Sequence, residues 1–313
     1  MQPVELSFVI PVFNAATTIG SVVERIHALY RDLAFEIVVV DDGSADDSER
    51  VCLALANRFP DTVVFLHLAR NFGEHGAVLA GLNHARGRYV AILDDDGQNP
   101  PEEVRALYRA IVESGRDVVY GRYRLKRHAP WRNIGSRFHD YVANVMLNKP
   151  RELYLSSFKI LNRFTVDEII RYKGAFPYID GLILRTTSNL GQIDVDHRSA
   201  DGPSTYTLRK LVRLWLNMFL NFSITPLRVS ALLGVATSVV SLFLLVAIVV
   251  DKLYVSPDLP HGLPTVLVVV TFFAGVQLVI LGTIGEYLGR LFLDHSSAPQ
   301  FVVRYVRRGG EAR

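Results

Sequence analysis

The sequence predicts an α/β protein, with a mainly parallel, doubly wound sheet followed by an interfacial amphipathic helix and a two-helix transmembrane hairpin. Over the first two thirds of the chain, short apolar runs alternate with segments of helical periodicity, which is the pattern of βα units. Two long uncharged stretches follow in the last third, and each could cross a bilayer as a helix. Half of the 313 residues are hydrophobic and 21% are charged, so the chain is too apolar for intrinsic disorder.

Five apolar runs are the expected strands, and their continuity is typical of strands that are covered on both faces. They are Leu6 to Val12, Phe35 to Val40, Val63 to Leu68, Tyr89 to Leu93 and Val118 to Tyr120. Between the first two, residues 19–30 keep a 3.6-residue period, with Thr17 or Thr18 as the N-cap. Residues 104–112 repeat this period after two prolines. In such sheets ligands bind at the carboxyl ends of the strands, so the residues just after each run are the candidates for a site.

The two uncharged stretches are Val229 to Val250 and Leu263 to Gly285, of 22 and 23 residues. The segment between them, 251–262, carries two prolines and predicts a short loop. A buried helical pair in a soluble core is the alternative, but the charges that flank both runs favour membrane spans. Basic residues cluster outside the two runs, whereas the loop holds only Lys252. The positive-inside rule therefore predicts that both termini are cytoplasmic.

An interfacial helix is expected just before the first span, where apolar residues recur at helical spacing with Arg209, Lys210 and Arg213 between them. This pattern suits the surface of an anionic bilayer, although a helix that faces a soluble core would look similar. The predicted organisation is a cytoplasmic α/β domain over 1–206, the interfacial helix over 207–227, the transmembrane hairpin over 228–290 and a cytoplasmic basic tail over 291–313.

Composition excludes several other classes of protein. The 34 basic and 31 acidic residues give a net charge of +3, which offers no general field for a polyanion, so no nucleic-acid partner is expected. Cys52 is the one cysteine; it can form no internal disulfide, which fits a reducing compartment, and we interpret it as a core residue. The first six residues show no basic segment followed by an apolar run, so no signal peptide is evident.

Acidic residues gather where the strands are expected to end. The first strand is followed by Phe13 and Asn14 and not by the glycine-rich fingerprint of dinucleotide-binding proteins. Three carboxylates in a row, 94–96, follow the fourth strand, and such a density of like charge is costly unless a cation neutralises it. Asp94 and Asp96 can converge on one hard divalent ion that keeps positions open for phosphate oxygens. The alternative is a solvated loop of aspartates that cap the next helix.

Four motifs in this order, together with Gly282–Arg290 near the end of the second span, resemble the family 2 glycosyltransferases of GT-A Rossmann-like fold. The motifs are Pro11-Val12-Phe13-Asn14, Val39-Val40-Asp41-Asp42-Gly43-Ser44, Arg70-Asn71-Phe72-Gly73 and Leu93-Asp94-x-Asp96-x-Gln98-x-Pro100-Pro101-Glu102. The chain looks most like the membrane branch of this family, the polyprenyl-phosphate glycosyltransferases related to dolichyl-phosphate mannose synthase and the bacterial GtrB and ArnC enzymes. The resemblance covers nearly the whole chain.

The resemblance implies a nucleotide-sugar donor over the sheet, with Asp94 and Asp96 as the catalytic pair that holds Mg²⁺ or Mn²⁺ against its diphosphate. The metal stabilises negative charge on the departing nucleoside diphosphate. The donor contacts that the resemblance implies are Pro11, Phe13, Asn14, Asp41, Asp42, Asp95 and Gln98, with Asp41 and Asp42 at the base and ribose. As alternatives, the aspartate and glycine at 42–43 could form a plain turn and Phe13 could be a core residue.

The acceptor side departs from the family pattern. Members usually carry an aspartate just before a Phe-basic-Leu stretch, and here Ser157 stands there, so no catalytic base carries over at this position. A phosphate monoester tolerates this loss because its second pKa is about 6, whereas a sugar hydroxyl needs a base far more. The candidate contacts of the acceptor phosphate are Arg122, His197, Arg198, Ser204, Tyr206 and Lys210, each alternatively a solvated surface residue. The lysine that the family carries after the serine is Thr205 here.

Together these observations predict an inverting enzyme that moves one sugar from a UDP- or GDP-linked donor to polyprenyl (undecaprenyl) phosphate. The reaction would take place at the cytoplasmic face of the inner membrane and supply a lipid-linked sugar for cell-envelope glycan or lipid modification. The expected partners are the nucleotide sugar, the polyprenyl phosphate and the lipid bilayer, and the Gly285-x-x-x-Gly289 spacing would permit a homo-oligomer. One alternative is a transferase that extends a lipid-linked glycan or polysaccharide, although the Q-x-x-R-W motif of processive synthases is absent. Another is a non-catalytic membrane scaffold, against which the intact Asp94 and Asp96 argue.

Overall fold

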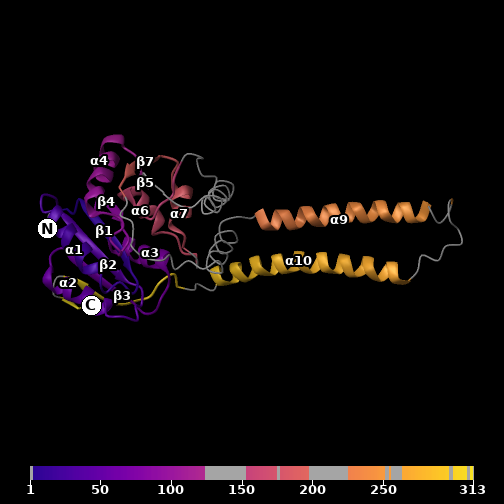
Figure 1. Ribbon diagram of the computed structural model, residues 1–313, viewed down its shortest axis with the longest axis horizontal. Coiled ribbons are helices and arrows are strands. Elements are labelled where there is room, and N and C mark those ends of the chain that lie inside the picture. Colours follow the sequence, from indigo (N-terminus) through magenta and orange to yellow (C-terminus); the bar gives the residue numbers. More distant parts are fainter. Residues whose placement is uncertain are drawn as a thin grey trace. The chain divides into compact units, whose positions relative to one another are not determined.

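The computed structural model describes residues 3–123, 153–174, 177–196, 225–250, 254, 263–295, 299–308 and 311–312 (Figure 1). The chain divides into two compact units. The first comprises residues 1–204 and 297–313, and the second comprises residues 205–296.

The first unit is built on one mixed, mainly parallel sheet. Its strands are β1 (Leu6–Val12), β2 (Phe35–Asp41), β3 (Val63–Leu68), β4 (Tyr89–Ile92), β5 (Val118–Tyr123), β6 (Lys159–Asn162), β7 (Leu190–Val195), β8 (Val303–Arg308) and β9 (Glu311–Ala312). Within the described residues their order in the sheet is β7-β5-β6-β4-β1-β2-β3-β8-β9. Strands β4, β1, β2 and β3 are mutually parallel, whereas β6 runs antiparallel to β4 and β5, and β8 antiparallel to β3.

Helices cover both faces of this sheet. They are α1 (Ile19–Leu29), α2 (Ser48–Arg58), α3 (Glu74–His84), the 3₁₀ turn η1 (Pro101–Glu103), α4 (Val104–Ser114), α6 (Arg163–Ile169) and α7 (Ile179–Thr186). One apolar cluster joins one face of the sheet to α1, α2 and α4, and a second joins the other face to α3, α6 and α7. Along β1, Phe8 and Ile10 enter the first cluster and Val9 enters the second, as the alternation of side chains in a strand requires. The doubly wound α/β fold is thereby confirmed.

The predicted elements lie close to the observed ones. The first and third strands have the predicted bounds, and Asp41 and Tyr123 extend the second and fifth. Thr18 stands at the N-cap position of α1, but its hydroxyl donates to the carbonyl of Ala15 at 3.3 Å and caps no helical N–H. Buried Cys52 lies in the first cluster, as the sequence predicted.

Within the segment predicted as a basic tail, residues 303–308 form strand β8. Strand β8 pairs with β3 from Val303 beside Leu68 to Arg308 beside Val64, with a register shift between His67 and Leu68. Without this pairing, β3 would present an open edge of unbonded backbone groups. The C-terminal segment therefore belongs to the sheet that carries the candidate site.

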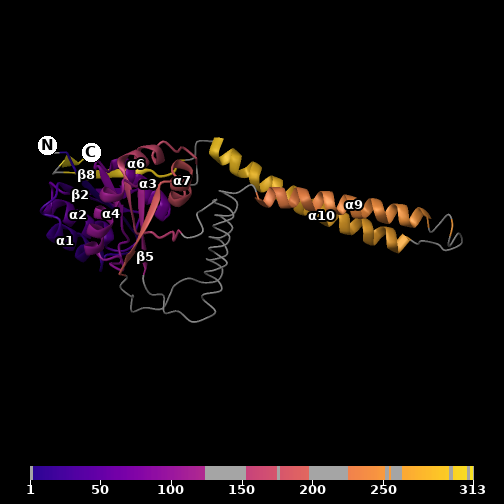
Figure 2. The same cartoon turned by 90° about the horizontal axis from the view of Figure 1, so that it is seen from above.

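The second unit contains two long helices, α9 (Thr225–Val250) and α10 (Leu263–His295), which lie side by side (Figures 1 and 2). They begin or end beyond the predicted spans, and the hydroxyl of Ser230 donates to that of Thr283 at 3.2 Å across the pair. Within the part of the chain that the structure describes, the window Phe272–Gly289 of α10 is long and apolar enough to cross a membrane. Most of residues 207–227 and of the loop 251–262 lie outside the described residues.

Candidate active site

The carboxyl ends of β1, β2 and β4 bring the predicted donor residues together. Beyond β1, the backbone N–H of Phe13 donates to Asp95 Oδ2 at 3.0 Å, which ties this loop to the loop after β4. The N–H of Asn14 donates to Ser44 Oγ at 3.0 Å, and Asn14 Oδ1 accepts the N–H of Ala45 at 2.9 Å, which ties it to the loop after β2. Three loops that lie far apart in the sequence thus form one bonded surface.

Within the described part of the chain, Asp94 is held through one of its two carboxylate oxygens. Its Oδ2 atom accepts hydrogen bonds from the amide of Asn99 and from the hydroxyl of Ser157, both at 2.7 Å. The hydroxyl of Tyr123 in turn donates to Asn99 Oδ1 at 2.8 Å. Burial raises the pKa of Asp94 to about 6, and repulsion from neighbouring carboxylates, Glu74 foremost, adds to the shift. Among the described residues, both hydrogen bonds that Asp94 accepts go to Oδ2, so Oδ1 is the oxygen available to a ligand.

The other two aspartates of the loop differ from each other. Asp95 links the loops after β1 and β4, because its carboxylate accepts a hydrogen bond from the N–H of Phe13. Burial raises the pKa of Asp95 to about 6. Asp96 is exposed. Its carboxylate is oriented by Gln98, whose N–H donates to Oδ1 at 2.9 Å and whose side-chain amide donates to Oδ2 at 2.5 Å. Asp96 therefore presents an oriented charge to solvent.

The donor set fits a hard divalent cation. Asp94 and Asp96 offer carboxylate oxygens, which Mg²⁺ and Mn²⁺ prefer. Among the described residues, no group of three or more His, Cys, Asp or Glu side chains is arranged to hold a metal ion. Two carboxylates suffice where substrate phosphates complete the coordination. The residues present therefore fit a cation that is bound together with a diphosphate.

The two aspartates at the end of β2 are embedded in the protein. Asp41 is fully buried, and its carboxylate accepts hydrogen bonds from the hydroxyl of Ser44 at 2.5 Å and from Nδ1 of His67 at 2.7 Å. Asp42 is 2% exposed and accepts the N–H groups of Phe72 at 2.7 Å and Gly73 at 2.8 Å. Burial raises the pKa of Asp42 to about 6 despite these bonds. Both residues build the loops around the site, and their contact with a base or ribose stays a prediction.

Phe13 and Pro11 lie where the motif predicted, at the carboxyl end of β1. The side chain of Phe13 is 49% exposed, so it is not a core residue. Pro11 is buried within β1. Of the two residues, Phe13 is the one whose ring is available to a ligand.

Sequence reasoning missed several polar residues beside this site. Ser157 was noted for the aspartate it replaces, but its bond to Asp94 could not be foreseen. Behind it, the buried Lys159 on β6 forms an ion pair with Asp180 at the start of α7, and the hydroxyl of Tyr120 donates to the same carboxylate at 3.0 Å. The basic position of the Phe-basic-Leu stretch that follows Ser157 was the sequence signal for this network.

Of the residues predicted to bind the acceptor phosphate, the structure describes Arg122. The Nε of Arg122 donates to Asp194 Oδ1 at 2.6 Å in a half-exposed ion pair. The other predicted contacts, His197, Arg198, Ser204, Tyr206 and Lys210, lie outside the described residues.

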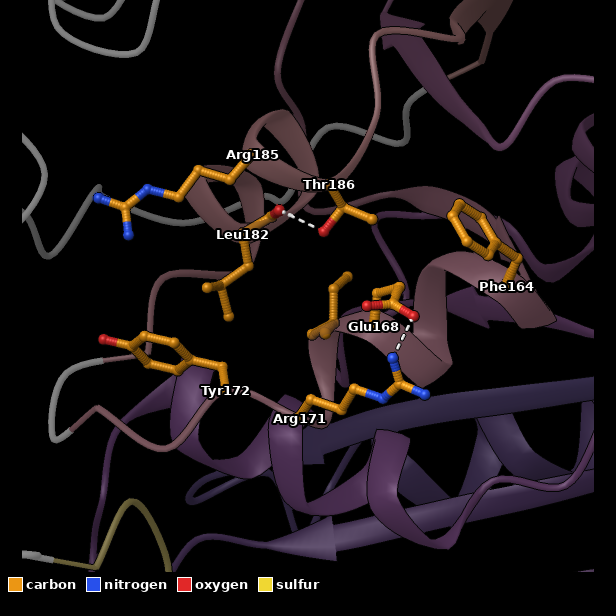
Figure 3. A pocket seen from close by; sticks show the side chains of 8 residues that line it. Phe164, Glu168, Arg171, Tyr172, Leu182, Arg185 and Thr186 are labelled. Carbon is orange, nitrogen blue, oxygen red and sulfur yellow. Dashed lines mark hydrogen bonds and ion pairs between the residues drawn. The ribbon is translucent and has the colours of Figure 1, made fainter.

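A separate groove of about 430 Å³ lies between α6 and α7 (Figure 3). It is lined by Phe164, Glu168, Ile169, Arg171, Tyr172, Leu182, Arg185 and Thr186. Figure 3 shows the Arg171–Glu168 ion pair on one wall of the groove. None of the described residues predicted for the donor or the acceptor lines it, so the groove is distinct from the loops that hold Asp94 and Asp96.

The chain is similar to known proteins in sequence and in fold. The chain is 31% identical over 312 residues to the undecaprenyl-phosphate 4-deoxy-4-formamido-L-arabinose transferase of Serratia proteamaculans, covering 98% of this chain and 95% of that one. It is 33% identical to the protein of the same name from Pseudomonas paraeruginosa, covering 98% and 91%. Among solved structures, glucosyl-3-phosphoglycerate synthase of Mycobacterium tuberculosis matches with a TM-score of 0.50 at 19% identity, covering 68% of this chain and 80% of that one. Mannosyl-3-phosphoglycerate synthase of Rubrobacter xylanophilus matches with the same TM-score and identity, covering 68% and 71%.

The structural matches show a shared fold, and the sequence matches go further. The model of the family described as glycosyl transferase family 2 matches residues 7–175, more than half of the chain. This range contains the three loops that form the candidate site. The chain belongs to glycosyl transferase family 2.

Proposed function

We propose that this protein transfers a single sugar, with inversion, from a nucleotide sugar to undecaprenyl phosphate at the cytoplasmic face of the inner membrane. The observation that carries the proposal is the loop after β4, where Asp94 keeps Oδ1 available and Asp96 is exposed, while Asn99, Ser157 and Gln98 orient the two carboxylates. The names of the relatives, which align over nearly the whole chain, support the choice of acceptor.

The proposed roles follow from exposure and bonding. Asp94 and Asp96 would hold Mn²⁺ or Mg²⁺, which when bound would stabilise the charge that develops on the departing diphosphate. The exposed ring of Phe13 and the loop at Asn14 would contact the nucleoside. Asp95 would keep these two loops together through its bond to the N–H of Phe13.

The chemistry on the acceptor side needs no carboxylate at position 157. A phosphate oxygen of the lipid would attack the anomeric carbon from the face opposite the diphosphate, while the bond from that carbon to the diphosphate oxygen breaks and its electron pair leaves with the nucleoside diphosphate. The acceptor is already largely ionised at neutral pH, because the second pKa of a phosphate monoester is about 6. Ser157 would therefore position Asp94 rather than remove a proton.

The second unit would anchor the enzyme in the membrane. Helix α10 contains the window Phe272–Gly289, which is apolar and long enough to span. Exposed apolar side chains, Leu232 and Phe243 among them, support α9 as the second span. Arg122, which would exchange its partner Asp194 for phosphate, and the basic residues of 197–210 would bind the acceptor head.

A turnover assay tests the proposal. Detergent-purified full-length protein would be given Mn²⁺ or Mg²⁺, undecaprenyl phosphate and a panel of UDP- and GDP-sugars that includes the 4-deoxy-4-formamido-L-arabinose donor. We expect nucleoside diphosphate release that needs both the lipid and the metal, and its loss in Asp94→Asn. Asp32→Asn is the matched control, because Asp32 is an exposed partner of Arg105 away from the site. Release that does not depend on the lipid phosphate, or none from any donor, would refute the proposal.

A further inference from the structure

A row of four side chains crosses the sheet near the carboxyl ends of β1, β2 and β3. Val12 pairs with Asp41, Asp41 with His67, and His67 with Tyr305 of β8. Residues directly opposite each other on neighbouring strands point to the same face of the sheet. Asp41 is fully buried and His67 is 6% exposed. The row therefore runs through the interior from the C-terminal strand to the candidate donor site.

Hydrogen bonds continue this row into the donor loops. The Nδ1 atom of His67 lies 2.7 Å from Asp41 Oδ2, and because a carboxylate can only accept, Nδ1 carries the proton. The other oxygen of Asp41 accepts the hydroxyl and the N–H of Ser44 at 2.5 and 3.3 Å. Ser44 Oγ in turn accepts the N–H of Asn14 at 3.0 Å. Through Ser44, Asp41 therefore holds the position of the loop that follows β1.

Asn14 needs such support. Its φ is +54°, which makes it the one non-glycine residue with positive φ among those that the structure describes. A side chain in this region of conformation costs about 1–2 kcal/mol relative to an ordinary one. The hydrogen bond that its N–H donates to Ser44 Oγ and the one that its Oδ1 accepts from the N–H of Ala45 offset that cost.

Tyr305 holds the His67 ring from the other side. The two rings stack with centroids 5.2 Å apart and planes 29° apart. The hydroxyl of Tyr305 donates to Glu49 Oε1 at 2.7 Å, which anchors the ring to α2. The strand that carries Tyr305 is itself anchored, because the amide of Gln300 donates to the carbonyls of Tyr172 and Gly174, both at 2.8 Å.

We propose that His67 and Tyr305 are positioning residues for the nucleoside part of the donor. Through Asp41 and Ser44 they hold the loop at Asn14 in its binding conformation, so the C-terminal strand completes the donor site. Neither residue lies in the motifs that predicted the site, and Tyr305 follows the long apolar helix in the chain. The inference rests on the proposed use of a nucleotide-sugar donor.

Binding of a nucleotide to the full-length protein in detergent tests this inference. UDP and GDP, each with Mn²⁺, would be titrated by calorimetry, and kcat and donor KM would be measured alongside. In His67→Leu, which removes the bond to Asp41, we expect the Kd of the bound nucleotide to rise about tenfold, as for a charge-assisted hydrogen bond. The donor KM should rise in parallel while kcat at saturating donor changes by less than about twofold. His67→Asn keeps an N–H near the Nδ1 position and should restore most of the affinity.

Tyr305→Phe and Tyr108→Phe form a matched pair. Each removes one hydroxyl bonded to a glutamate, Tyr305 to Glu49 at 2.7 Å and Tyr108 to Glu5 at 2.9 Å, but only Tyr305 touches His67. We expect Tyr305→Phe to raise the nucleotide Kd about threefold and Tyr108→Phe to leave it unchanged.

The outcomes separate the two proposals. If the wild-type protein binds neither UDP nor GDP, the proposed function fails. If it binds one of them and His67→Leu binds it equally tightly, the positioning role is overturned. If His67→Leu does not fold, the test passes to His67→Asn and Tyr305→Phe: a raised Kd in Tyr305→Phe at an unchanged Tm supports the inference, and an unchanged Kd overturns it.

Discussion

The ends of β2 and β4 both carry adjacent aspartates, but these differ in burial and in hydrogen bonding. At the end of β2, Asp41 and Asp42 are buried, and both oxygens of each carboxylate accept hydrogen bonds from the protein. At the end of β4, Asp94 accepts its hydrogen bonds through one oxygen, and Asp96, whose two oxygens are bonded to Gln98 of its own loop, is exposed. An acidic pair at a strand end can therefore build the walls of a site or face the ligand, and burial together with the bonding partners distinguishes the two.

The largest expected effect is on turnover and falls on the β4 side. Asp96→Asn should lower kcat at least about a thousandfold, because a bound cation is worth several kcal/mol of transition-state stabilisation. Its Tm should hardly change, since Asp96 is exposed. Chelation of the metal from the wild-type protein should have the same effect, reversed by Mn²⁺. Nucleoside diphosphate release measures both, and an active Asp96→Asn variant would contradict the contrast between the strand ends.

The next effect is on stability and falls on the β2 side. Gly43 has a φ of +66°, and an added Cβ would lie 2.7 Å from the carbonyl carbon of Arg70. Gly43→Ala should therefore destabilise the protein by about 3 kcal/mol, from backbone strain and the clash together. Gly115→Ala is the control, since its φ is +62° but no atom lies within 4 Å of the added Cβ, and it should cost only about 1 kcal/mol. Equal losses of Tm in the two variants would show that the contact between the loops is unimportant.

A pH dependence of similar size should arise at Asp42. Its pKa is raised to about 6 in the folded protein against about 3.9 when unfolded, so the folded state binds the extra proton between these values. The stability that Asp42 contributes is thus present at pH 4 and is lost as the pH rises through 6. Relative to Asp42→Asn, the wild-type protein should lose up to about 3 kcal/mol between pH 4 and pH 7. Thermal unfolding of both proteins at several pH values measures this difference, and a constant difference would contradict the burial argument.

The smallest effect on stability is expected at Arg122. Its ion pair with Asp194 is half exposed, and such pairs contribute about 0–1 kcal/mol. Arg122→Gln should therefore leave Tm nearly unchanged while it raises the KM for undecaprenyl phosphate. Asp194→Asn, which frees Arg122, should not raise that KM. If both variants behave alike in the turnover assay, Arg122 has no part in binding the acceptor.

The sequence predicted the fold best where its patterns are local. Continuous apolar runs located the first four strands because both faces of the sheet are covered. Helix α3 showed no amphipathic pattern, because residues 76–82 are buried all around it. An alanine Cβ at Gly81 would lie 2.4 Å from Val9, so only glycine allows the helix to approach β1 this closely. Such an approach leaves no periodic signal.

The sequence predicted which loops form the site, but not the role of each aspartate in them. The motifs placed Asp42 and Asp94 in the same region. Their different roles depend on their hydrogen-bond partners, Gly73 for Asp42 and Ser157 for Asp94, which come from other segments of the chain. Strand β8 escaped prediction because its basic, partly apolar sequence follows a long helix and pairs only with the distant β3. Its contact with His67 depends on register, which no local pattern encodes.

The most direct test of the central claim is the binding of Mn²⁺, followed by electron paramagnetic resonance, in full-length protein with and without UDP. We expect UDP to tighten Mn²⁺ binding in the wild-type protein and in Asp32→Asn. Asp94→Asn and Asp96→Asn should lose this binding although they stay folded. Mn²⁺ binding that is unchanged in both variants would contradict the assignment of the loop after β4 as the metal-diphosphate site.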